Sequence, residues 1–227
     1  MTLLPSPRMG LMAQQKEERR QRIREESRRL LIEQGYEGLT VRKLASACGL
    51  SVPTLYNLVG SKATIIAEDA IETFRRVSER FDAAAEGDPI DRAFALYEVV
   101  RVEILSREAY FRALLPHLDA VPELRPVRDA VGQLQVAQLV QVLSAGPRKS
   151  FQAEFDVRLA ASQLYDLAIA AFTGWAVGRV PEEQLEARLR HGAALVLASG
   201  ARGASKQKLL EIARESAAAL QQSAVER

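Results

Sequence analysis

The stretch that decides the fold lies at residues 40–60 and reads TVRKLASACGLSVPTLYNLVG. Thr40 is suited to cap a helix, and apolar residues then recur at helical spacing until Gly49 breaks the pattern. Ser51 is a second capping residue, and Pro53 lies in the first turn of the next helix, where its missing N–H costs nothing. The stretch therefore predicts two short helices joined by a tight turn, which is the pattern of a helix-turn-helix.

The second of these helices has one apolar face and one face suited to base edges. Leu55 and Leu58 are able to anchor it, while Pro53, Thr54 and Asn57 are able to point outward. Thr54 offers a hydroxyl and a methyl group, and an asparagine is able to pair with adenine through two hydrogen bonds. On spacing alone, a helical hairpin that merely caps a bundle remains an equal alternative.

Helical patterning continues on both sides of the stretch. We expect the N-terminal helices at about residues 15–34, 41–48 and 52–58, followed by a longer one capped by Ser61 that ends near Gly87 and Pro89. The later segments with the same patterning are 89–106, 107–115, 122–145, 153–180, 182–200 and 204–222. No stretch alternates as strands do. The predicted fold class is all-α.

The segment from Leu159 to Gly178 raises the question of a membrane helix, because it contains no lysine or arginine. Ser162, Gln163 and Asp166 argue against that interpretation, since a charge in a lipid-facing helix is expensive. We interpret the segment as a buried helix of a cytoplasmic protein, at a subunit interface.

Charge is unevenly distributed along the 227 residues, although the formal net charge is only +2. Residues 1–62 carry 11 Lys and Arg against 6 Asp and Glu, whereas the remainder carries 20 against 23. A basic N-terminal region permits a polyanionic partner but does not require one, because a modest imbalance also occurs on ordinary surfaces.

Several function classes are excluded by residue usage. The single cysteine, Cys48, and two histidines are too few for a disulfide scaffold or a Cys/His zinc site, and we interpret Cys48 as a small buried residue. There is no Gly-rich phosphate loop, no G-x-S-x-G and no H-E-x-x-H motif. The sequence therefore predicts no enzyme, no cofactor and no metal.

The region from about Arg20 to Ala67 resembles the N-terminal domain of the tetracycline-repressor (TetR) family of transcriptional regulators. The resemblance rests on these segments in order: Gln34-Gly35-Tyr36, Leu39-Thr40-Val41-Arg42-Lys43-Leu44-Ala45, Cys48-Gly49-Leu50-Ser51 and Val52-Pro53-Thr54-Leu55-Tyr56-Asn57-Leu58-Val59-Gly60-Ser61-Lys62. The combined pattern is far more specific than any one part, and the rest of the chain matches only in architecture.

The resemblance implies a set of DNA-contacting residues, which are Arg42, Lys43, Val52, Pro53, Thr54, Tyr56, Asn57 and Lys62. Of these, Tyr56 and Lys62 are implied to meet phosphates. Two positions depart from the family, which usually has an aromatic residue at Asn57 and often a histidine at Leu58. Because of these two departures, the resemblance does not predict the operator sequence.

The resemblance also implies three regions. We expect a disordered arm at 1–15, a helix-turn-helix domain at 16–62 and a helical ligand-binding and dimerisation domain at 63–227. The basic residues at and after the arm, Arg8, Lys16, Arg19 and Arg20, are either a DNA-contacting element or part of a disordered leader.

Two sets of residues follow for the C-terminal region. The expected contacts of an apolar or aromatic effector are Phe94, Tyr97, Glu103, Tyr110, Phe111, His117, Gln163 and Asp166. The expected interface of a homodimer is formed by Gly174, Trp175, Gly178, Leu185, Leu189, Ala193 and Val196.

The implied function is a repressor that a small molecule releases from a palindromic DNA operator. The alternative is a helical protein-interaction scaffold without sequence-specific DNA binding, since everything after the fourth helix is compatible with it.

Overall fold

The computed structural model describes residues 7–84, 87–145 and 150–225. Its regular elements over these ranges are helices, apart from an isolated antiparallel bridge between Phe151 and Ala201. The predicted all-α class is confirmed. The chain divides into two compact units, one ending at Ala70 and the other beginning at Ile71.

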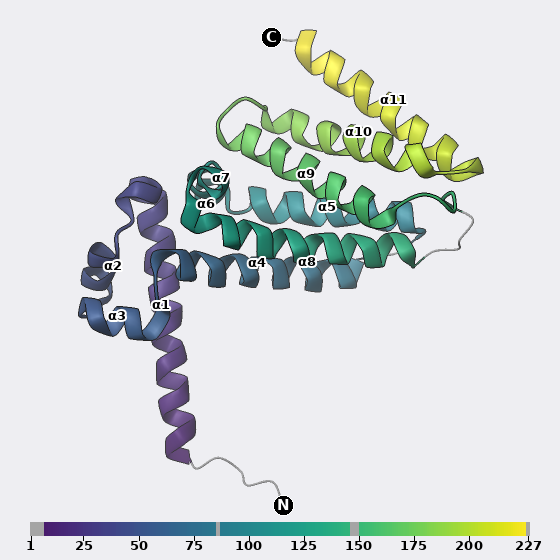
Figure 1. Cartoon of the computed structure of the whole chain (residues 1–227). Helices are drawn as coiled ribbons and strands as arrows, with labels where there is room; N and C mark the ends of the chain where they lie inside the picture. The colour runs from purple at the N-terminus through teal and green to yellow at the C-terminus, as the bar shows by residue number, and fades with distance from the viewer. Residues whose placement is uncertain (1–6, 85–86, 146–149, 226–227) are drawn as a thin grey trace, which may run out of the picture. The chain divides into compact units, whose positions relative to one another are not determined.

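The first unit consists of three helices and the start of a fourth (Figure 1). Their bounds are α1 (Pro7–Gly38), α2 (Val41–Cys48), α3 (Val52–Val59) and α4 (Lys62–Ala84). The expected bounds of the two short helices, 41–48 and 52–58, agree with the structure to within one residue.

Side-chain caps fix the starts of these helices. The Thr40 hydroxyl accepts a hydrogen bond from the Lys43 N–H at 3.3 Å, and the Ser51 hydroxyl accepts one from the Thr54 N–H at 3.2 Å. Ser61 does the same for the Thr64 N–H at 3.2 Å. Gly49 ends α2 with φ 66°, a left-handed conformation that glycine adopts without steric cost. The three caps predicted from sequence are therefore confirmed.

The first helix is longer than its expected range of 15–34. It begins at Pro7, a residue tolerated in the first helical turn, so residues 7–15 are helical where we expected a disordered arm. Residues 1–6 of that arm lie outside the described residues. The expected break at Gly35 occurs, because this residue interrupts the helix with φ 70° and ψ 179°.

Apolar side chains from all four helices form the core of the first unit. The largest fully buried ones are Ile23, Leu31, Leu39, Leu44, Leu55, Ile65 and Ile66. Within this unit the nearly buried carboxylate of Asp69 on α4 pairs with the guanidinium of Arg28 on α1. This pair compensates the burial of a charge.

The second unit contains the remaining helices. Their bounds are α5 (Pro89–Leu105), α6 (Glu108–Leu114), α7 (His117–Ala120), the 3-10 turn η1 (Pro122–Leu124), α8 (Arg125–Ser144), α9 (Val157–Ala176), α10 (Glu182–Gly200) and α11 (Gly203–Val225). The expected segments from 89–106 to 182–200 each contain one of these helices, and the segment 204–222 lies within α11. The short α7 was not expected. The helix expected at 153–180 is confined to α9, because Asp156 caps it by accepting the Leu159 N–H at 3.0 Å.

Helix α9 packs against α8 on one side and α10 on the other, and α11 packs on α10 (Figure 1). Phe172 and Trp175 of α9 are buried, as are Leu185 and Leu197 of α10. Among the described residues, no helix has the length and apolar character that crossing a membrane requires.

Asp88 ties the start of α5 to α11. Its Oδ1 accepts the N–H groups of Ile90 and Asp91 at 2.8 and 3.0 Å, and its Oδ2 lies 3.1 Å from the Lys208 ammonium. Partial burial raises the pKa of Asp88, but the Asp91 N–H and the lysine outweigh it, so the pKa lies below its ordinary value of 3.8.

We expect Asp88→Ala to lower the free energy of unfolding by about 1 kcal/mol at neutral pH, because the variant has no side-chain cap. A carboxylate with a lowered pKa stabilises the fold above its unfolded-state pKa and ceases to do so as pH falls through the folded value. The difference between the two proteins should therefore shrink below pH 3.8. Urea unfolding at neutral and acidic pH checks this, and a difference that grew on acidification would contradict it.

Candidate nucleic-acid interface

Helix α3 has a sharply divided surface. Leu55 is fully buried and Val59 is 3 % exposed, so these two side chains anchor the helix to the first unit. Leu58, which we expected as a second anchor, is only partly buried. Pro53, Thr54, Tyr56 and Asn57 are exposed, and Val52 is partly so. The helix thus presents short or hydrogen-bonding side chains to solvent from an immobilised backbone, as a helix that enters a DNA groove must.

Thr54 is held at the N-terminal end of α3. Its hydroxyl lies 2.7 Å from the Ser51 hydroxyl, and either group is able to donate. A threonine hydroxyl has one proton and two lone pairs, so Thr54 keeps hydrogen-bonding capacity for a base or phosphate. The N-terminus of a helix also favours anions.

Tyr56 is 50 % exposed and is therefore not a core aromatic residue. Asn57 is also exposed, with no hydrogen-bond partner among the described residues. The two side chains that the sequence suggested for a phosphate and a base therefore both lie at the surface of α3.

The basic residues of α2 are exposed as well. Arg42 has no carboxylate partner in the described part of the chain, and Lys43 donates to the side-chain oxygen of Gln34 on α1. Both are accessible to a polyanion, because the lysine ammonium has donors besides the one that Gln34 accepts.

Lys62 has a structural role that the sequence did not predict. Its ammonium donates to the backbone oxygen of Tyr36 at 3.0 Å and lies 3.5 Å from the centre of the Tyr36 ring. These contacts tie the start of α4 to the end of α1, with a cation–π contribution. An ammonium has three donors, so a phosphate contact from the same group remains compatible with this arrangement.

Cys48 lies at the end of α2 and is 7 % exposed. Burial raises the pKa of its thiol, and the charge of Glu26 raises it further. A raised pKa means little thiolate at neutral pH, which agrees with a packing residue.

Of the residues expected to contact an effector, Tyr97 and Asp166 border different pockets in the described part of the chain. Tyr97 is the member of the set that borders an enclosed cavity between α5, α8 and α9, and that cavity measures only about 20 Å³. Its hydroxyl donates to the Leu164 backbone oxygen at 2.6 Å, and burial raises its pKa. A cavity of this size holds about one water molecule.

The other expected effector contacts are engaged elsewhere. Glu103 is 2 % exposed and pairs with Arg76 at 3.2 Å and Arg80 at 2.8 Å, which makes it a structural carboxylate. Phe94, Tyr110 and Phe111 are buried, each with an arginine over its ring. His117 is partly buried at the start of α7, and Gln163 is exposed. Sequence spacing identified apolar faces here, but it did not show which of them surround empty space.

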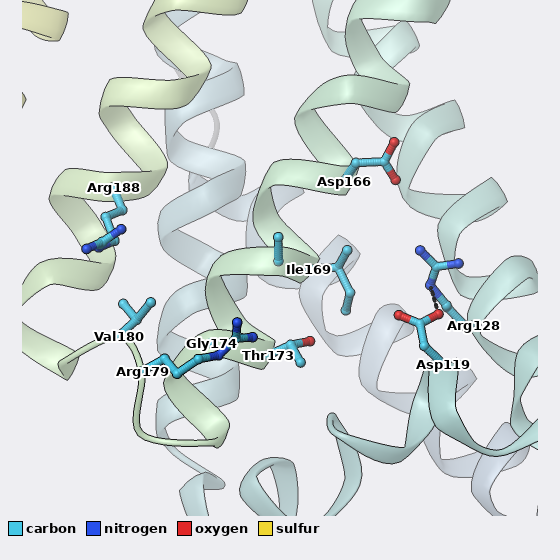
Figure 2. Close-up of a pocket in the computed structure, with 10 residues that line it drawn as sticks. Asp119, Arg128, Asp166, Ile169, Thr173, Gly174, Arg179, Val180 and Arg188 are labelled. Atoms are coloured by element: carbon cyan, nitrogen blue, oxygen red, sulfur yellow. Dashed lines mark ion pairs between the residues drawn. The ribbon is translucent and has the colours of Figure 1, made fainter.

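Asp166 borders an open hollow at the surface of α9 (Figure 2). The hollow measures about 710 Å³, and its charged residues are Asp119, Arg128, Asp166, Arg179 and Arg188. Arg128 pairs with Asp119 at 3.0 Å, while Arg188 bonds to the side chain of Gln184. The mixed charge and the exposure of this hollow do not suit the apolar or aromatic effector that we expected.

Most of the expected dimer residues are buried inside their own chain. Trp175 and Leu185 have no exposed surface, Ala193 has 1 % and Leu189 has 4 %. A side chain without exposed surface in the single chain buries none on dimerisation, so these four are core residues. Gly174 is also buried, packed against Val180, whereas Gly178 is exposed and Val196 partly so.

A different set of apolar residues on α9 and α10 faces solvent. Leu159 is 57 % exposed, Leu167 38 % and Leu195 48 %. The helical spacing that marked α9 and α10 as interface helices did not distinguish the side facing the core from the opposite side.

Residues 23–68 match the family model described as bacterial regulatory proteins, tetR family. The match covers α2, α3 and the adjoining parts of α1 and α4. A search of curated proteins finds no match.

Solved structures align with most of the chain at low sequence identity. A TetR-family regulator from Syntrophomonas wolfei aligns with a TM-score of 0.69 at 16 % identity, covering 80 % of this chain and 96 % of its own. NalD of Pseudomonas aeruginosa, the secondary repressor of the MexAB-OprM multidrug efflux pump, gives 0.62 at 18 %, covering 82 % and 98 %. Thermus thermophilus FadR, a repressor solved with lauroyl-CoA, gives 0.64 at 18 %, covering 82 % and 97 %. The likeness to these proteins is one of fold.

Proposed function

We propose that the chain, whose residues 23–68 match the tetR family of bacterial regulatory proteins, is a homodimeric repressor that a small molecule releases from a palindromic DNA operator. A DNA-binding transcriptional regulator is the function that the family match and the fold support.

The observation that carries the proposal is the divided surface of α3. Leu55 and Val59 fix the helix, and Thr54, Tyr56 and Asn57 are left at its exposed face. We assign Thr54 and Asn57 to base edges, and Arg42, Lys43, Tyr56 and Lys62 to phosphates. We assign Val52 and Pro53 to the part of the helix that comes close to the DNA groove.

We assign dimerisation to the exposed sides of α9 and α10, where Leu159, Leu167 and Leu195 lie. A two-fold dimer places two copies of α3 in related positions, so its operator is an inverted repeat. A protein-interaction scaffold would have no such requirement.

We place the effector at the small cavity between α5, α8 and α9, which Leu96, Tyr97, Val100 and Leu139 border. An apolar or aromatic ligand larger than a water molecule must widen this cavity, and it therefore favours a conformation other than the one described. A ligand that prefers a conformation of low DNA affinity lowers that affinity by linkage. FadR, with its bound lauroyl-CoA, is a relative in fold whose ligand has an apolar chain.

The experiment that tests the proposal is selection of binding sites from a random duplex library by the purified protein at physiological salt. Enrichment of one inverted repeat is the expected result. A folded protein that enriches no sequence would contradict it and would favour the scaffold interpretation.

We expect Thr54→Ala to weaken binding to the selected repeat by about 1 to 3 kcal/mol for each base that the side chain no longer reads, and to relax selection at that base pair. Binding to random duplexes should change little, because phosphates dominate that binding. Thr54→Ser keeps the hydroxyl and should retain most of the discrimination. Titrations of both variants on selected and random duplexes check this, and an equal weakening on both would remove Thr54 from base readout.

A further inference from the structure

Residues 14–19 of α1 lie at the surface of the first unit, outside its core. Gln14, Gln15, Lys16, Glu17, Glu18 and Arg19 are all exposed, and Arg20 is partly buried. We call residues 14–20 the α1 extension. Figure 1 shows α1 passing α3 and continuing beyond it.

The face of α1 that is apolar in the core becomes basic in the extension. Ile23, Ser27 and Leu30 are buried at spacings of three and four residues, which places them on one side of the helix. At 3.6 residues per turn, the same side continues through Lys16, Arg19 and Arg20. Glu17 and Glu18 fall on other sides, where Glu17 pairs with Arg24.

This basic face lies beside the end of the proposed DNA-reading helix. The guanidinium of Arg20 donates through Nε to the backbone oxygen of Leu58, the next-to-last residue of α3, at 3.0 Å. Lys16 is one helical turn further out, about 6 Å along the axis. The basic face therefore lies next to the C-terminal end of α3.

A helix that is polar on all sides has no core to stabilise it, and isolated helices of this length are marginal in water. Cations gathered on the side next to α3 are complementary to a polyanion already held by α3. We propose that Lys16, Arg19 and Arg20 bind phosphates of double-stranded DNA beside the base pairs that α3 reads. This inference rests on the proposed function, because it takes α3 to be the reading helix.

The test compares the wild-type protein with K16Q/R19Q on the selected inverted repeat, titrated over a range of salt concentrations. Arg20 is left in place because it holds Leu58. The logarithm of affinity should fall less steeply with the logarithm of salt, by about 0.9 for each phosphate that the variant no longer binds. At physiological salt the affinity should fall about tenfold or more, and each single variant should give part of the change.

The matched control is E17Q/E18Q, which alters neighbouring charges on the other sides of the same helix. It should bind as tightly as the wild type or more tightly. Circular dichroism of the variants establishes that their helical content is unchanged, as expected for exposed residues. An unchanged salt slope in K16Q/R19Q would overturn the inference.

A second measurement locates the contacts. Ethylation of individual operator phosphates should block wild-type binding at positions that no longer matter to K16Q/R19Q. Identical interference patterns for the two proteins would also overturn the inference. If neither protein selects a sequence, the proposed function fails, whereas selection with identical salt slopes leaves the proposed function standing and removes only the role of the α1 extension.

Discussion

Leu55→Ala is expected to lower the free energy of unfolding of the first unit by about 3 kcal/mol and to abolish operator binding. Leu55 is fully buried, and a large-to-small change at such a site removes apolar burial and leaves a cavity. Because Leu55 fixes α3 to the core, its truncation also frees the helix that presents Thr54 and Asn57. Amide hydrogen exchange in α2 and α3, together with titration of the selected repeat, measures both effects.

The neighbouring residue supplies the control. Tyr56 is half exposed, so Tyr56→Ala should leave stability within about 0.5 kcal/mol while still weakening DNA binding. The fluorescence of Trp175, the only tryptophan and a residue of the second unit, should be unchanged in both variants. If Leu55→Ala left the amide exchange rates of α3 unaltered, the Leu55 side chain would not be the anchor of this helix.

The helix-turn-helix could be predicted from sequence because its determinants are local. Thr40, Gly49 and Ser51 act on backbone groups within a few residues, and each leaves a recognisable residue type at a fixed offset. The same reasoning located the exposed side of α3, since a short helix with Leu55 on one side has Thr54, Tyr56 and Asn57 on the others. The structural role of Lys62 was harder to predict from sequence, because its contact is with Tyr36 on another helix.

The second unit could be predicted only as a set of helices. Apolar spacing identifies a side that will be buried, but it does not say what buries it. Trp175 and Leu185 therefore looked like interface residues although their own chain covers them, and Leu159 and Leu195 were not singled out although they are exposed. Cavities depend on packing between helices far apart in sequence, so Tyr97 could not be distinguished from Phe94.

Gly200, the last residue of α10, contacts residues that are far away in sequence. The segment before α9 is paired with the end of α10, since the Gln152 N–H donates to the Gly200 oxygen at 2.8 Å and Phe151 bridges Ala201. Phe155 stacks on Phe151 with ring centres 4.9 Å apart. Its ring lies against Gly200 so closely that an added Cβ would overlap the ring carbons.

Gly200→Ala should therefore lower the free energy of unfolding by about 3 kcal/mol, the upper part of the range for overpacking. This is opposite in sign to the usual effect, because alanine is better than glycine in a helix by about 1 kcal/mol. Urea unfolding followed by Trp175 fluorescence measures it.

Phe155→Ala removes the ring that the new methyl group would overlap, and it supplies the control. In the double variant the Gly200 substitution should cost far less than it does alone, giving a coupling free energy of about 1 kcal/mol or more. Additive effects would mean that α10 absorbs the methyl group by another route. Because α9 and α10 carry the proposed dimer face, we expect Gly200→Ala to weaken dimerisation and with it operator binding. That binding should recover at high protein concentration. Binding by Leu55→Ala should not, since its defect lies in the reading helix of each protomer.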